Sequence, residues 1–136
     1  MGWSFVVDAR SAVEFIMCIS CMLMGLSHMA QPRMWRDYFT ALHEQGVPGI
    51  VTRTFALELW PALIIVTFHQ HWSGPGIVLT VYGWLLLAKC CISVLMPRIG
   101  LRSLAMARKG DSVFVLGGAV LLIIGVTAGM ALWWRQ

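Results

Sequence analysis

The sequence predicts an all-α integral membrane protein, a four-helix bundle with two short amphipathic helices at one membrane interface. Three observations predict this fold: four long apolar stretches, a charged fraction of only 12%, and a Pro-Arg segment that occurs twice between apolar stretches. Hydrophobic residues make up 59% of the chain, and soluble domains carry about twice as many charged residues. A soluble chain of this size could not cover so much apolar surface. The lipid bilayer is therefore the expected solvent and partner.

Each apolar stretch is long enough to cross a bilayer, because about 20 helical residues span a hydrocarbon core of about 30 Å. Ser11 and Glu14 fit a capping box, so we expect Ser11 to cap the first span, which is retained rather than cleaved as a signal. Asp111 is expected to cap the fourth span. We expect one membrane domain over residues 1–136, with spans at about 12–29, 49–69, 76–96 and 113–134.

The short connections make neighbouring spans antiparallel and divide the basic residues unequally between the two membrane sides. Seven basic residues lie on one side, whereas Arg10 and Arg135 lie on the other. Cytoplasmic loops carry an excess of Lys and Arg, so we expect both termini outside, which is the periplasm for a protein of the bacterial inner membrane. The charges are too few for a nucleic-acid groove, so no nucleic-acid partner is expected. The seven residues are Arg33, Arg36, Arg53, Arg98, Arg102, Arg108 and Lys109.

Each Pro-Arg pair begins a short amphipathic segment, at about residues 33–45 and 98–109. Proline suits the first turn of a helix, because its missing N–H would have no partner there. Four apolar residues of the first segment recur at i, i+3, i+4 and i+7 and so share one helix face. We interpret this face as an anchor in the interface or as a docking face for a partner. The four residues are Trp35, Tyr38, Phe39 and Leu42.

The two halves of the chain follow one pattern, in which a short amphipathic segment connects two spans. Both copies run in the same direction across the membrane. The pattern is therefore typical of a parallel two-fold internal repeat, related by an axis along the membrane normal.

Two ionisable side chains lie deep within predicted spans, Glu58 in the second and Lys89 in the third. Counting from the inner ends at about 1.5 Å per residue places them about 13 Å and about 10 Å deep, close enough to pair. Charges inside a membrane are costly and mark functional sites or structural pairs. We interpret them as an intramembrane charge pair that either fixes helix register or, beside a kink at Pro61, forms a proton or substrate site. Arg53 lies nearer the interface and is expected to snorkel towards it.

The cysteines and histidines are weaker candidates for chemistry. Cys18 and Cys21 form a Cys-x-x-Cys pattern, but their mid-membrane position disfavours thiolates, so we interpret them as small packing residues. His69 and His71 are weak candidate metal ligands, because residues two apart on a helix point to different sides. No metal or cofactor is predicted. Haem or quinone is the alternative if these residues serve a redox role.

The last span contains a GxxxG pattern formed by Gly125 and Gly129. Small residues at this spacing let two membrane helices approach closely. The pattern therefore indicates helix packing, either within the bundle or against another subunit.

Several short patterns together resemble a group of small four-span bacterial inner-membrane proteins. This resemblance covers most of the chain, and it implies no activity because that group has none assigned. The patterns are Gly25-Leu-Ser-His28, Pro32 and Trp35 in the first half, then His69-Gln-His-Trp72, Leu79-Thr-Val-Tyr-Gly-Trp84, Lys89 and Pro97 in the second.

The sequence favours a non-enzymatic accessory or scaffold subunit of a larger inner-membrane complex, with a membrane-protein partner or as a homo-oligomer. Four spans have little surface left to make a binding site specific, and the chain offers no complete ligand set. One alternative is a small oligomeric transporter or channel that uses Glu58 and Lys89. A second alternative is a quinone- or haem-linked redox protein.

Overall fold

The computed structural model describes residues 8–134, so Arg135 lies outside the described part of the chain. Four helical segments are long and apolar enough to cross a membrane, which confirms the predicted all-α four-helix fold. Their ends lie within three residues of the predicted ends. The spans are α1 (Ala9–Ala30), the continuous segment Val47–Phe68, α5 (Gly76–Leu95) and α7 (Asp111–Trp133). The second span consists of α3 (Val47–Thr52), the π-helix η1 (Arg53–Glu58) and α4 (Leu59–Phe68).

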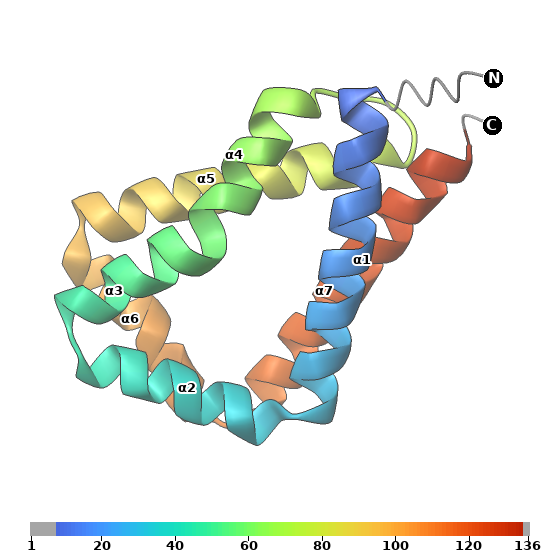
Figure 1. Cartoon of the computed structure of the whole chain (residues 1–136). Coiled ribbons are helices and arrows are strands. Elements are labelled where there is room, and N and C mark those ends of the chain that lie inside the picture. Colours follow the sequence, from blue (N-terminus) through green and yellow to red (C-terminus); the bar gives the residue numbers. More distant parts are fainter. Residues whose placement is uncertain (1–7, 135–136) are drawn as a thin grey trace, which may run out of the picture.

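The spans pack as two antiparallel pairs, α1 with α7 and α4 with α5 (Figure 1). The pairs meet where α1 begins and α7 ends, which we call the terminal end. Towards the opposite end they diverge, and α2 (Pro32–Glu44) and α6 (Pro97–Ala105) connect them there (Figure 1). A short 3-10 helix, η2 (Met106–Lys109), follows α6. We call this second end the α2–α6 end. Each half of the chain thus has the order span, short helix, span.

Glycines let α1 and α7 approach closely. A Cβ atom on Gly25 would lie 2.7 Å from the carbonyl oxygen of Gly118, and the reverse substitution would be as tight. A Cβ on Gly125 would lie 3.1 Å from the carbonyl oxygen of Cys18, and one on Gly129 would lie 3.1 Å from the Cys18 Sγ. The GxxxG pattern therefore contacts a helix of the same chain. Close backbone contact of this kind stabilises helix pairs in lipid, where no hydrophobic force acts between helices.

Both predicted helix caps are wrong. The N-cap of α1 is Asp8, whose carboxylate accepts a 2.6 Å hydrogen bond from the Ser11 backbone N–H. The N-cap of α7 is Gly110, whose φ of 121° favours glycine. Asp111 is instead the first helical residue of α7, and its carboxylate accepts a 2.7 Å hydrogen bond from Arg36. The N-cap of α1 therefore lies three residues before Ser11, and that of α7 lies one residue before Asp111.

The apolar face of α2 is mostly used within the chain. Leu42 is 3% exposed and lies in a small core that α2 shares with α3 and α6. Trp35 and Phe39 are half-buried and line the cavity described below. Tyr38 is 40% exposed. Of the predicted docking face, Tyr38 is therefore the residue that remains available to a partner.

Candidate ligand-binding site

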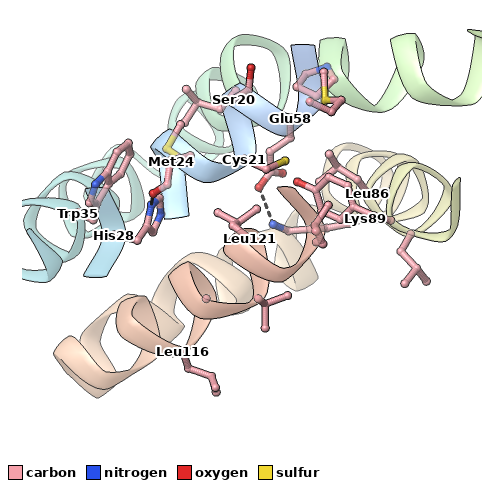
Figure 2. Close-up of a pocket in the computed structure, with 18 of the residues that line it drawn as sticks. Ser20, Cys21, Met24, His28, Trp35, Glu58, Leu86, Lys89, Leu116 and Leu121 are labelled. Carbon is pink, nitrogen blue, oxygen red and sulfur yellow. Dashed lines mark hydrogen bonds and ion pairs between the residues drawn. The ribbon is translucent and has the colours of Figure 1, made fainter. Parts of the chain in front are cut away.

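A cavity of about 650 Å³ lies between the two helix pairs (Figure 2). This volume is within the range of about 300–1,000 Å³ typical of small-molecule sites. Its wall is largely apolar, and the helices α1, α2, α4, α5 and α7 contribute to it together with the π-helical segment. Apolar lining residues include Met17, Met24, Leu86, Leu116 and Leu121.

Glu58 and Lys89 are the charged side chains that line this cavity, and they contact each other. The Lys89 Nζ donates a 2.5 Å hydrogen bond to the Glu58 Oε1 (Figure 2). The Glu58 side chain is 12% exposed, whereas the Lys89 side chain is 43% exposed. The structure thus brings together the two residues that the sequence singled out, and the ammonium group remains accessible.

Arg53 lies behind Glu58 and does not snorkel to the interface. It is 1% exposed, and its guanidinium donates hydrogen bonds to Ser93 Oγ at 3.0 Å and to Ser103 Oγ at 3.2 Å. The Arg53 Nε lies 3.6 Å from the Glu58 Oε2. The expectation of snorkelling is wrong because hydroxyl groups of α5 and α6 bind the guanidinium inside the protein. A three-membered cluster of Arg53, Glu58 and Lys89 results.

The π-helix η1 explains how Arg53 and Glu58 reach the same side of one helix. In an α-helix, residues five apart point about 140° apart. A π-helical turn closes i→i+5 hydrogen bonds, which brings such residues to one side. The Leu59 N–H accordingly donates to the Thr54 carbonyl oxygen, five residues earlier. Pro61 favours this local widening, because it has no N–H and its ring crowds the carbonyl of the preceding turn.

The charges of the Arg53–Glu58–Lys89 cluster sum to +1. Arginine stays protonated in proteins, and a proton transfer between Glu58 and Lys89 would not change their total charge. Within residues 8–134, the ion pairs of Arg53 and of Lys89 are both made with Glu58. One positive charge is therefore left without a carboxylate partner in this part of the structure.

Aromatic side chains form the cavity wall nearest the α2–α6 end. The rings of His28 and Trp35 stack with centroids 4.3 Å apart and planes inclined by 14°. The His28 Nδ1 lies 2.8 Å from the Met24 carbonyl oxygen and therefore donates to it. The Trp35 Nε1 donates a 2.9 Å hydrogen bond to Ser27 Oγ. His28 was not predicted to line a site with Trp35, since the two residues lie on different helices.

A second ionic cluster lies at the terminal end, outside the cavity. Glu14 and His69 are fully buried there, and the Glu14 Oε1 lies 3.0 Å from Arg10 Nε and 2.9 Å from His69 Nε2. The interpretation of Glu14 as a capping residue alone is therefore wrong. The rings of His69 and His71 are 6.5 Å apart, and His69 binds Thr80 through its other nitrogen at 3.0 Å. Among residues 8–134, no group of three or more His, Cys, Asp or Glu side chains is placed to hold a metal ion.

The fold defines the class of protein, which is a small helical integral membrane protein with four candidate spans. Comparison of the chain with known protein families, with curated proteins and with solved structures finds no match. The cavity and the two ionic clusters are therefore the features of this chain that point to a function.

Proposed function

We propose that this protein binds an amphipathic ligand with a single acidic group inside the membrane. The acid contacts Lys89, and the apolar part of the ligand lies along the cavity. The observation that carries this proposal is the charge of +1 on a cluster that borders an apolar cavity. An uncompensated charge is costly in a low-dielectric environment, and a monoanion removes that cost.

Lys89 is the group best placed to bind the acid. An ammonium group has three N–H donors, and one of them is used by Glu58. Its side chain is the more exposed of the two charged residues that line the cavity. Glu58 holds the ammonium group at the wall, and Arg53 balances the Glu58 carboxylate from behind. Lys89 therefore presents further N–H donors to a ligand.

The depth of Lys89 narrows the class of ligand. Lys89 lies six residues before the end of α5 at Leu95, which is about 9 Å along the helix axis. A phosphate group of a bilayer lipid stays at the interface, and a dianion would exceed the single charge of the site. A weak acid that is easily dehydrated, such as a long-chain carboxylic acid or an acidic phenol, fits both limits.

The proposal is tested by thermal unfolding of the purified protein in a mild detergent, with oleic acid as the probe and oleyl alcohol as its uncharged counterpart. We expect oleate to raise the melting temperature, because a ligand present at 100 times its Kd raises the free energy of unfolding by about 2.7 kcal/mol. Lys89→Met should remove most of this gain. Lys109→Met is the matched control, since Lys109 is the other lysine of the chain and is exposed on η2.

Equal shifts with oleate and oleyl alcohol would show that the charge of the site plays no part in binding. An unchanged oleate shift in Lys89→Met would contradict the assignment of Lys89 as the contact. Native mass spectrometry of the protein extracted from its own membrane then identifies the natural occupant. That mass should be present in the wild-type protein and in Lys109→Met and be depleted in Lys89→Met.

The second candidate function is the accessory or scaffold subunit expected from the sequence. The observation that favours it is the exposure of Lys89 inside a span, next to Leu85, which is 66% exposed. A partner helix with a carboxylate could cover this flank in place of a ligand. Mild-detergent extraction should then recover a reproducible heteromeric complex that Lys89→Met disrupts. Recovery of the chain alone or as a homo-oligomer would exclude this candidate.

A further inference from the structure

The ionic cluster at the terminal end connects the two helix pairs. Glu14 belongs to α1, and His69 directly follows α4. The distance between Glu14 Oε1 and His69 Nε2 is 2.9 Å, and both residues are 0% exposed. Thr80 of α5 completes the cluster through its contact with His69 Nδ1 at 3.0 Å. The contact between Glu14 and His69 therefore joins the α1–α7 pair to the α4–α5 pair.

The hydroxyl group of Thr80 determines which His69 nitrogen carries a hydrogen. Thr80 Oγ1 lies 2.8 Å from the carbonyl oxygen of His71, and two oxygens so close require the hydroxyl to donate. A hydroxyl has one hydrogen, so Thr80 Oγ1 must accept from His69 Nδ1. A neutral imidazole has hydrogen on one nitrogen only, which leaves His69 Nε2 as an acceptor.

Two acceptors then face each other, the His69 Nε2 and the Glu14 Oε1. They can approach to 2.9 Å in a buried site only when a proton lies between them. We propose that Glu14 and His69 form a proton-binding site that holds one shared proton and joins the two helix pairs while that proton is bound. Loss of the proton leaves opposed lone pairs, which weakens the contact between α1 and the end of α4.

Other charged and titratable side chains of residues 8–134 lie close to this site. Arg10 contacts the Glu14 carboxylate, Asp8 caps the start of α1, and the ring of His71 lies 6.5 Å from that of His69. Within the described residues, α4, α5 and α7 contribute no charged side chain at the terminal end. Burial first, and then the Arg10 guanidinium, lower the pKa of His69. Both effects oppose a positive charge on the imidazole of His69.

The count of protons fixes the sign of the pH dependence. In the unfolded chain, Glu and His have pKa values of about 4.3 and about 6.5, so the pair holds less than half a proton above about pH 6.5. The folded pair holds one. The unfolding equilibrium constant should therefore rise with pH above about 6.5, by up to about tenfold per pH unit, until the folded pair loses its proton. Between about pH 4.3 and pH 6.5 both states hold one proton, so the pair's contribution to the free energy of unfolding does not change with pH.

The other tautomer of His69 predicts a pH dependence of stability with the opposite sign. If His69 carried its hydrogen on Nε2 and donated it to a Glu14 carboxylate, the folded pair would bind no additional proton. The unfolded state would then bind more protons below about pH 6.5, and the protein would become more stable as the pH rises through that value. The direction of the pH dependence thus separates the two assignments.

The experiment measures unfolding in detergent from pH 5.5 to pH 8.5 for the wild type, Glu14→Gln and Glu44→Gln. The amide introduced by Glu14→Gln donates to His69 Nε2 without titrating. The stability of this variant should therefore not decrease above about pH 6.5. Glu44 is exposed at the end of α2, so the stability of Glu44→Gln should decrease above about pH 6.5 as that of the wild type does. A wild-type stability that exceeds that of Glu14→Gln increasingly as the pH rises would overturn the proposal.

A spectroscopic measurement tests the same site without changing Glu14. The chain has four histidines, so the triple variant His28→Gln, His43→Gln, His71→Gln keeps His69 alone. Nitrogen-15 NMR of this variant at pH 7 should show that Nδ1 carries a hydrogen. A neutral ring with hydrogen on Nε2 only would overturn the proposal.

Discussion

Glu14 and Glu58 each lie between an arginine and a second basic side chain, yet their surroundings differ. Glu14 and His69 are fully buried at the terminal end and connect the helix pairs, and together with the partly exposed Arg10 they form what we call the closed cluster. Glu58, Arg53 and Lys89 form what we call the open cluster, in which Glu58 and Lys89 border the cavity and the Glu58 Oε2 has no hydrogen-bond partner among the described residues. We infer that such charges stabilise the fold where the carboxylate and its histidine partner are both enclosed, and we propose that they offer a binding site where the ammonium group stays accessible.

The largest expected effect comes from removing the carboxylate of the open cluster. Glu58→Gln leaves Arg53 buried without its counter-charge, so we expect it to lower the free energy of unfolding by about 3–5 kcal/mol. Lys89→Met leaves Arg53 and Glu58 balanced, so its cost should be below about 1 kcal/mol. Chemical denaturation in detergent measures both values. Equal losses in the two variants would show that the cluster has no excess positive charge.

The second effect concerns the rigidity of the α1–α7 pair, on which both clusters depend. A Cβ on Gly118 would lie 2.6 Å from the carbonyl oxygen of Gly25, so Gly118→Ala must push the helices apart. We expect a loss of about 1–3 kcal/mol, which is typical of overpacking. Gly117→Ala is the matched control, because a Cβ on Gly117 meets no atom within 4 Å. Similar stability of the two variants would show that α7 tolerates displacement from α1.

The four-helix fold could be predicted because hydropathy and helix length act locally and leave few alternatives. The contact between Glu58 and Lys89 also follows from a depth count along two spans, since both are costly charges in lipid. Arg53 could not be assigned to the same cluster, because its position depends on a π-helix. A Pro such as Pro61 indicates a disturbed helix but does not say which residues the disturbance brings together.

Glu14 was misinterpreted for a different physical reason. Its spacing from Ser11 fits a local capping pattern, and that pattern explains the carboxylate without any distant partner. The actual partner, His69, lies 55 residues away in the sequence. The pairing depends on how the two helix pairs meet, and the pattern of apolar residues does not determine this. Local patterns therefore describe the spans well and the contacts between pairs poorly.

A variant with a small expected change in stability sharpens the comparison most. Thr80→Val keeps the shape of a fully buried side chain and removes the acceptor of His69 Nδ1, so we expect a loss of about 1 kcal/mol. Thr67→Val is the matched control, because Thr67 is exposed on α4. Without the Thr80 hydroxyl, His69 can carry its hydrogen on Nε2 and donate it to a Glu14 carboxylate. The closed cluster then needs no additional proton.

The stability of Thr80→Val should consequently not decrease above about pH 6.5, although this variant leaves both members of the proton-binding pair in place. Denaturation at pH 6 and at pH 8 measures the change, with Thr67→Val expected to follow the wild type. A Thr80→Val protein with the wild-type pH dependence would show that the hydroxyl does not set the His69 tautomer. In that case a feature other than the Thr80 hydrogen bond would have to distinguish the closed cluster from the open one.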